Sequence, residues 1–389
     1  MRSSAATGAN MRPLYGGTVL AYADRFAIAP VLVAISRDLD DSLAAVTAVA
    51  TFYFLFYAAL QPVYGLLSDR LGRVRVMRAC LAGMAVANAA AAAAPDLGAL
   101  IAAKAIAAGF AAALLPTSLV YVGDRVPFAG RQAVIANLLA AGALGTTIAT
   151  VSAGLLASFA TWRAVFAILA LVALALAVAM GAVTESLASD RRAGPLTQMR
   201  RVLAQRWALF VVGLALAEGA TMVGFITFLA PALQADGASA ALAGLVVAAY
   251  GVAVFAGMQL LKRVIRAAGV PAAALIAAGG ALLVVAYLAA AVDQSPVGIL
   301  VASTVIGLGY CFLHSTLQTW ATEVAPEARG TATSLFVTAV FVGAAVATAA
   351  VSGLADEQRY DVVFLIAAAV AAPVGVVGAI ARARYRGGL

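Results

Sequence analysis

The stretch "GLLSDRLGRVRV", residues 65 to 76, places four charges and two glycines between two long apolar runs. Gly65 lets neighbouring helices approach closely, and Gly72 permits a tight turn of the backbone. Asp69 is expected to accept a hydrogen bond at a helix terminus or to pair with a base, whereas Arg73 and Arg75 are expected to stay at the surface. The stretch therefore predicts a short polar connection between two helices.

Apolar runs continue from this connection to both ends of the chain. The 389 residues are 64% hydrophobic and 11% charged, whereas a soluble globular protein is only about half apolar. A run of about 20 apolar residues crosses a hydrocarbon core, and such a span must be helical because lipid cannot satisfy exposed backbone groups. We predict an all-α membrane protein with twelve spans, at 14–35, 44–67, 76–94, 98–121, 132–157, 163–183, 207–230, 240–261, 271–291, 297–320, 331–354 and 361–381.

The basic residues are distributed unevenly over the connections. Twelve spans place both termini on one side, and 20 of the 25 Lys and Arg residues fall on that side. Arg37, Arg163 and Arg359 fall on the other side, and Arg25 and Lys104 lie within spans. The positive-inside rule makes both termini cytoplasmic, so we expect a multi-pass protein of the bacterial cytoplasmic (inner) membrane. The net charge of +8 thus encodes topology and predicts no nucleic-acid partner.

The chain also divides into two similar halves. A polar segment, residues 184–206, separates six spans in 1–183 from six spans in 207–389 and is expected to be a cytoplasmic linker. "DRVPFAGRQAVIANLLAAGALGTTIATVSAGLLA" from Asp124 is echoed by "TEVAPEARGTATSLFVTAVFVGAAVATAAVSGLA" from Thr322. Two repeated six-helix bundles are the architecture of a secondary transporter, whose site lies near the midplane between them.

The opening stretch resembles the signature loop between helices 2 and 3 of the major facilitator superfamily. The matching residues are Gly65, Asp69, Arg70, Gly72, Arg73 and Arg75. The resemblance implies a fold of two pseudo-symmetric six-helix bundles. It also implies that this loop is a conformational latch, which holds the cytoplasmic ends of the halves together in the outward-facing state.

Two branches of that family share features with the chain. "HSTLQTWATEVAPEARGTATSLF", residues 314–336, resembles the twelve-span, proton-driven drug and sugar efflux branch. That branch carries an Arg in helix 4, where this chain has Lys104, and a Gly-Pro motif in helix 5 that this chain lacks. The pair Asp24-Arg25 is similar to the anion symporter and spinster-type lysolipid branches. There the acid carries protons and the base meets an anionic substrate group.

Asp24, Arg25 and Glu218 are the charges expected to matter most. Asp24 lies ten residues into its span, about 15 Å deep, where loss of water disfavours a charged carboxyl and lets it exchange protons. Arg25 is expected to be a fixed charge for an anion or for Asp24. Because adjacent helical residues do not face each other, partners from other helices are expected. Glu218 occupies the matching depth in helix 7, so we expect both acids to face one shared cavity; a buried structural pair is the alternative for each.

Other polar and aromatic residues within spans are weaker candidates for the cavity. Lys104 can extend its stem to the nearby membrane surface or point into the cavity. His314 is either a proton relay or a residue that holds two helices together. The full set of these candidates is Tyr22, Phe26, Tyr57, Gln61, Lys104, Asn137, Tyr250, His314 and Gln318.

The sequence favours a proton-coupled secondary active transporter that works by alternating access and exports small amphipathic compounds. The first alternative is a proton-coupled carrier of an anionic organic solute or lysolipid, gripped by Arg25. The second is a membrane receptor or assembly factor that transports nothing. No metal-ligand spacing and no phosphate-binding loop of the GxxxxGK type occurs in the sequence. We therefore expect no enzyme activity, metal or cofactor, and a monomer that binds substrate, protons and lipid.

Overall fold

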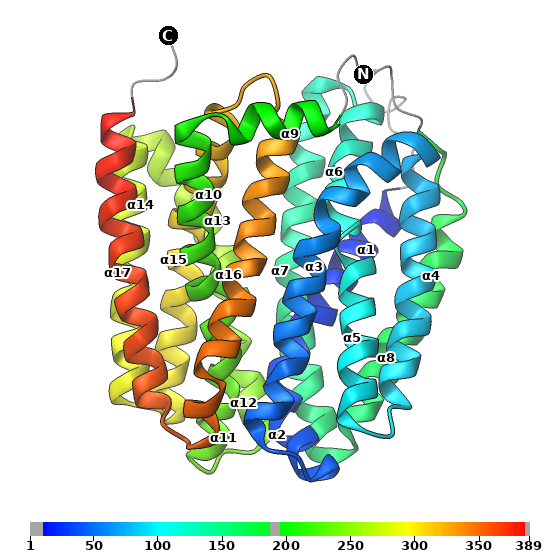
Figure 1. Cartoon of the computed structure of the whole chain (residues 1–389), viewed down its shortest axis with the longest axis vertical. Helices are drawn as coiled ribbons and strands as arrows, with labels where there is room; N and C mark the ends of the chain where they lie inside the picture. The colour runs from blue at the N-terminus through cyan, green and yellow to red at the C-terminus, as the bar shows by residue number, and fades with distance from the viewer. Residues whose placement is uncertain (1–10, 187–194, 386–389) are drawn as a thin grey trace, which may run out of the picture.

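A computed structural model describes residues 11–186 and 195–385, which form a bundle of helices and no strand. One half of the bundle contains the helices up to residue 180, and the other half contains those from residue 206 onward (Figure 1). The first half consists of α1 (Arg12–Phe26), α2 (Ile28–Leu39), α3 (Leu43–Leu71), α4 (Arg73–Ala92), α5 (Leu97–Ala111), α6 (Leu114–Arg125), α7 (Phe128–Phe159) and α8 (Trp162–Met180).

The second half begins with a helix that changes its winding twice. It consists of α10 (Arg206–Gly219), a π-helical turn η1 (Ala220–Gly224), a 3-10 turn η2 (Phe225–Phe228), α11 (Leu229–Ala235), α12 (Ala240–Val247), α13 (Ala249–Ala268), α14 (Ala272–Val292), α15 (Pro296–Glu323), α16 (Arg329–Asp356) and α17 (Tyr360–Arg384). In the sequence, α9 (Pro195–Leu203) follows the first half and precedes the second, and it lies across one end of the bundle (Figure 1). Residues 187–194 of the expected linker lie outside the described residues.

The expected number of spans is confirmed. Among residues 11–186 and 195–385, eleven segments are long and apolar enough to cross a membrane, and α1 with α2 makes a twelfth when the pair is taken as one span bent by 45°. Short connections begin the next helix with a capping side chain. Ser42 accepts the Ala45 amide, and Ser295 accepts the Gly298 amide.

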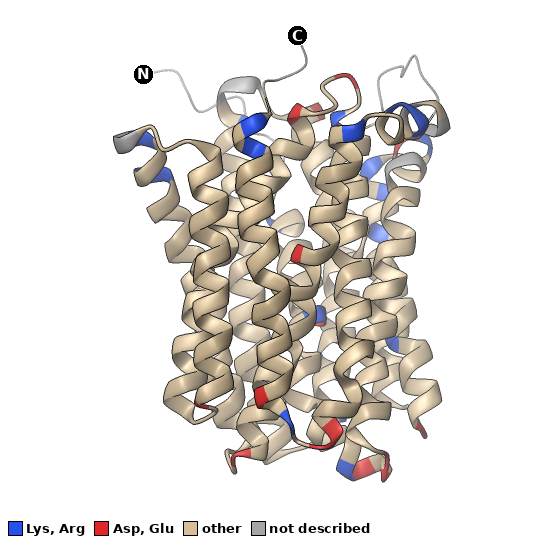
Figure 2. Ribbon diagram, turned by 60° about the vertical axis from the view of Figure 1, so that its left-hand side comes forward, with Lys and Arg blue, Asp and Glu red and all other residues tan. Residues whose placement is uncertain are grey.

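The two ends of the bundle differ in charge. Lys and Arg gather at the end where α1 begins and α17 ends, which we call the basic end (Figure 2). The opposite end, which we call the acidic end, contains the connections with Asp40, Asp96, Asp236 and Asp293.

The halves meet along two seams, α3 against α16 and α7 against α12 and α13. The first seam includes the Ala44 amide bonded to Asp356 at 3.2 Å and the Thr51 and Thr348 hydroxyls 2.8 Å apart. In the second seam, a Cβ added to Gly154 would lie 2.3 Å from the Ala240 carbonyl oxygen, so only glycine fits there. These contacts lie in the acidic half of the bundle, where the two halves are closed upon each other.

Candidate functional site

The first buried pair joins span 1 to span 4. Lys104 of α5 donates to Asp24 of α1, with Nζ 2.6 Å from Oδ1, and it also donates to Asn88 of α4 at 3.0 Å. Asp24, Lys104 and Asn88 are all 0% exposed. The ammonium also lies 4.6 Å from the Phe166 ring and 5.5 Å from the Tyr53 ring. Oδ2 of Asp24 has no hydrogen-bond partner, so the carboxylate retains one open position for a proton.

The second buried pair joins span 7 to span 10. His314 Nδ1 of α15 lies 2.8 Å from Oε1 of Glu218 in α10. Glu218 is fully buried, whereas His314 is 13% exposed. The imidazole lies flat on Tyr310, with ring centroids 4.6 Å apart and an angle of 16° between planes. Oε2 of Glu218 has no hydrogen-bond partner, as in the first pair.

Each acid stands just before an interruption of its helix. Asp24 lies three residues before Ala27, where α1 ends and α2 departs at 45°. Glu218 lies two residues before the π-helical turn. Within that turn, the carbonyl oxygen of Thr221 accepts a hydrogen bond from the Tyr287 hydroxyl. Interrupted helices near the midplane are typical of transporter binding sites.

A cavity of about 230 Å³ lies between the halves. Its inner wall includes Tyr22, Arg25 and Phe26 of α1, with Tyr250 of α13 and Tyr310 of α15. Its outer part is lined by apolar residues of α7 and α13 and reaches the exposed Gln132 and Lys262 near the basic end: Ile135, Ala136, Leu139, Val254, Phe255 and Met258. The outer part of this cavity therefore lies toward the basic end, away from the contacts that close the acidic half.

Arg25 is the charged group of the inner wall. Its guanidinium carbon lies 4.6 Å from the Tyr22 ring centroid, 4.7 Å from Phe26 and 5.3 Å from Phe341. The Nε atom is buried without a hydrogen-bond partner. No ion pair to Arg25 occurs within residues 11–186 and 195–385. A half-buried cation that contacts aromatic rings and has no ionic partner offers its hydrogen-bond donors to a ligand.

The structure corrects two expectations about the charges. Asp24 and Glu218 do not line the shared cavity; each is enclosed within its own half by a base from three spans further along the chain. Lys104 does not extend to the membrane surface, because its ammonium is bonded to Asp24 in the interior. Lys104, and not Arg25, is therefore the counter-charge of Asp24. Asp24 has a partner from another helix, whereas Arg25 has no ionic partner within the described residues.

The remaining candidates fall into two groups. Tyr22, Phe26 and Tyr250 line the cavity. Outside its lining lie Tyr57, stacked on Phe341 at 4.0 Å; Gln61, buried in α3; Asn137, exposed on α7; Gln318, half-buried on α15; and Lys104 and His314, in their pairs. Tyr310 was missed, because an aromatic residue in a span carries no sequence mark of facing a cavity.

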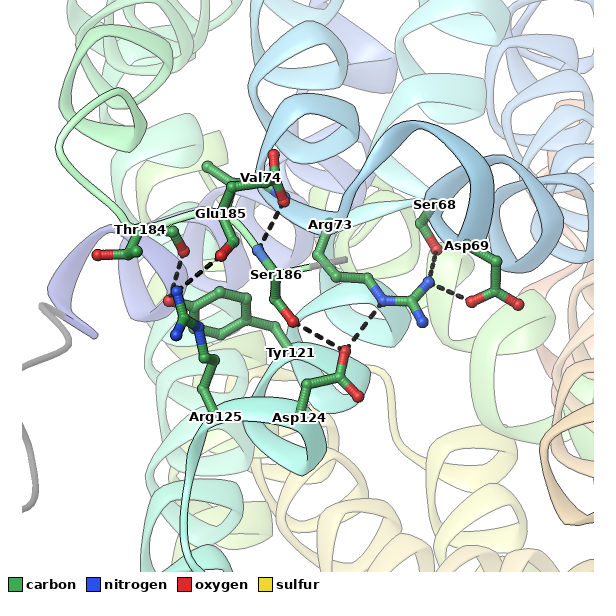
Figure 3. A network of polar contacts seen from close by, with 10 residues as sticks. All are labelled: Ser68, Asp69, Arg73, Val74, Tyr121, Asp124, Arg125, Thr184, Glu185 and Ser186. Carbon is green, nitrogen blue, oxygen red and sulfur yellow. Dashed lines mark hydrogen bonds and ion pairs between the residues drawn. The ribbon is translucent and has the colours of Figure 1, made fainter. Parts of the chain in front are cut away.

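The loop at residues 65–76 forms a polar network at the basic end (Figure 3). Arg73 forms an ion pair with Asp69, approaches Asp124 of α6 at 3.3 Å, and donates to the Ser68 hydroxyl at 2.8 Å. Arg73 is only 2% exposed, so the expectation that it stays at the surface is wrong. Gly65 lies within α3, and Arg70 and Arg75 are exposed.

Gly72 and Glu185 shape the turn between α3 and α4. Gly72 has φ +100°, and a Cβ there would lie 2.7 Å from the Glu185 carboxyl carbon. That carboxylate accepts the amides of Val74 and Arg75, each at 2.9 Å, and so caps the first turn of α4. The network in Figure 3 thus ties the loop to α6 and to the residues after α8, all before residue 187. Glu185 was missed, because one acid in a polar segment gives no signal of its partner.

Comparison with known proteins agrees with this architecture. A triacylglyceride transporter of Mycolicibacterium hassiacum is 32% identical over 160 residues, 39% of this chain and 30% of that protein. A multidrug efflux pump of Mycolicibacterium smegmatis is 33% identical over 150 residues, 38% of this chain and 28% of that protein. The matched stretches thus span under a third of these relatives.

Solved structures match over almost the whole chain. The nucleoside transporter NupG superposes with a TM-score of 0.75 at 14% identity, covering 97% of this chain and 100% of that one. A bacterial homologue of the lysosomal transporter Spinster, inward-facing and unoccupied, gives a TM-score of 0.70 at 18% identity, covering 94% and 96%. The sequence model of the Major Facilitator Superfamily matches residues 14–348 and, in a second match, residues 211–387. The chain therefore belongs to the major facilitator superfamily.

Proposed function

We propose that this transporter is a proton-coupled exporter of small amphipathic compounds, and that it prefers those with an acidic headgroup. The observation that carries the proposal is the inner wall of the cavity, where the half-buried Arg25 lies among aromatic rings without an acidic partner in the described chain. The charged residues that line the cavity are Arg25 and Lys262, both basic. A cation in a membrane interior is costly unless it is paired, and an anionic headgroup would supply the pair.

The rest of the cavity suits the apolar part of such a molecule. The wall between Arg25 and the basic end is formed by aliphatic and aromatic side chains of α7 and α13. The volume of about 230 Å³ lies below the range of roughly 300–1,000 Å³ that drug-sized ligands occupy. In this conformation the cavity therefore fits a headgroup with a short apolar segment.

Asp24 is the proposed proton carrier. When Asp24 takes up a proton on Oδ2, the Lys104 ammonium loses its ionic partner but keeps Asn88 and the faces of Phe166 and Tyr53. Protonation thus breaks an ion pair without leaving the lysine unsupported. Since the pair holds span 1 against span 4 beside the bend at Ala27, its loss would free the bend to move.

The direction of transport is argued from charge and from relatives. The positive-inside rule places the basic end in the cytoplasm, so the cavity would open inward in this conformation. The loop at Gly65 to Arg75 would then act as the cytoplasmic latch in the opposite conformation. Export of drug-like compounds without an acidic group is the second candidate function, because three matched relatives are named as drug transporters or resistance proteins.

Transport into liposomes that contain the purified protein tests the proposal. Purified protein in liposomes with an imposed proton gradient is compared for uptake of decyl phosphate, an anionic amphiphile, and tetraphenylphosphonium, a cationic one. We expect gradient-driven uptake of decyl phosphate that is lost on addition of a protonophore and lost in Asp24→Asn. Arg25→Gln should abolish decyl phosphate uptake, and Arg25→Lys should retain part of it.

Lys262→Gln provides the matched control, because Lys262 is an exposed base at the outer rim of the same cavity. Loss of uptake in Lys262→Gln as complete as in Arg25→Gln would mean that surface charge, and not the Arg25 site, governs binding. Uptake of tetraphenylphosphonium alone, unchanged by Arg25→Gln, would favour the second candidate. Absence of any proton-driven movement would overturn transport and favour a receptor or assembly role.

A further inference from the structure

The two buried pairs join corresponding spans of the two halves, and the two acids lie at the same depth, although Lys104 lies seven residues and His314 eighteen residues after the first residue of its helix. Asp24 and Lys104 belong to spans 1 and 4, and Glu218 and His314 belong to spans 7 and 10, which are the same spans counted within each half. In both pairs an acid of the first span precedes a helix interruption and meets a base of the fourth span. In both pairs one carboxylate oxygen is bonded to the base, while the other has no partner.

We propose that Glu218 and His314 form a second proton-binding site, so that each transport cycle moves two protons, one through each half. This inference rests on the proposed proton coupling at Asp24. It assigns proton binding to Glu218 and His314 together, and neither of these residues lines the cavity.

The chemistry of the second pair differs from that of the first. The bond between Oε1 and Nδ1 already contains one proton, which leaves the pair with a net charge of −1 when the imidazole is otherwise neutral. A second proton, on the imidazole or on the free Oε2, makes the pair neutral. The first pair changes from neutral to +1 when Asp24 is protonated. Both pairs therefore have a protonated and a deprotonated state. The side chains that already surround each pair can form hydrogen bonds in either state.

The second pair has a connection to the cavity. Glu218 is fully buried, but His314 is the partly exposed member and stacks on Tyr310, which lines the cavity. The titratable groups near the pair include Tyr310 itself and Tyr250 of α13, and both tyrosines also interact with Arg25 of the cavity. From α16 the imidazole meets the apolar ring of Phe336, with centroids 5.6 Å apart. His314 thus adjoins the cavity wall at Tyr310.

Histidine suits this position because its charge ordinarily changes between pH 5 and 8. The chain contains a single histidine. Protein made with 15N-labelled histidine therefore reports His314 alone by nuclear magnetic resonance in liposomes. We expect the imidazole signal to show that His314 gains a proton, and we expect this signal to change in Glu218→Gln. Asp24→Asn should leave it unchanged.

The proton count is measured on the same preparations. The imposed pH difference that just balances a decyl phosphate gradient gives the number of protons moved per molecule. We expect about two in the wild-type protein and one in Glu218→Gln and in His314→Gln. Glu323→Gln is the matched control, because Glu323 lies on the same helix but pairs with Arg382 at 2.6 Å at the basic end; its ratio should stay at two.

The outcomes separate the two proposals. A ratio of one in the wild-type protein, unchanged by Glu218→Gln, would overturn the second site and leave coupling at Asp24 intact. An imidazole signal that stays in one charge state from pH 5 to 8 would overturn the second site even if the ratio were two. No movement of protons with decyl phosphate in any variant would instead remove the proposed function itself.

Discussion

Removal of the Lys104 ammonium should destabilise the protein, because it leaves the Asp24 carboxylate without its ionic partner. Lys104→Met keeps an unbranched stem of similar length in the same fully buried place. Two unit charges 2.6 Å apart attract each other by about 6 kcal/mol at an effective dielectric constant of 20. Desolvation cancels part of this attraction, and breaking a buried pair from one side lowers the free energy of unfolding by about 3–5 kcal/mol. We expect a loss of up to that size, because Asp24 would be left as an unpaired buried charge until it took up a proton.

The assay is the midpoint of thermal inactivation in detergent, measured for Lys104→Met and for the double variant Asp24→Asn/Lys104→Met. The double variant has no buried charge, so it should recover most of the lost stability. Lower pH should also restore Lys104→Met, since a protonated Asp24 is neutral. A single variant as stable as the wild-type protein, or a double variant no better than the single, would refute the electrostatic account.

Three further changes test the loop and the seams. Gly72→Ala should lower the free energy of unfolding by about 1–3 kcal/mol, since φ +100° with ψ +148° belongs almost only to glycine; Gly213→Ala, in open space within α10, is its control and should be neutral or stabilising by thermal unfolding. Glu185→Ala should expose two capped amides of α4 and cost about 1–3 kcal/mol, and an unchanged unfolding midpoint would contradict the capping role. Gly154→Leu should prevent close packing of α7 against Ala240 and so abolish decyl phosphate transport, while the protein still folds. Normal transport by this variant would show that the close contact between Gly154 and Ala240 is not needed for transport.

Much of the architecture could be predicted because it depends on local composition. The length of each apolar run predicted the membrane spans. The loop at Gly65 to Val76 indicated the family that the comparisons then confirmed. The depth of Asp24 and of Glu218 followed from counting residues along a helix of constant rise. The bend at Ala27 and the π-helical turn after Glu218 could not be predicted, because both depend on how neighbouring helices press on these segments.

The amino-acid sequence by itself determined that this chain crosses the membrane repeatedly in two similar halves, because burial in lipid is governed by the composition of each segment. Only the tertiary structure showed that Asp24 pairs with Lys104, that Glu218 pairs with His314, and that Arg25 lines the cavity. The physical reason is that the rotation and height of each helix, set by packing over its whole length, determine which side chains meet. A shift of one residue turns a helical side chain by about 100°, and no local pattern specifies that rotation for two helices at once.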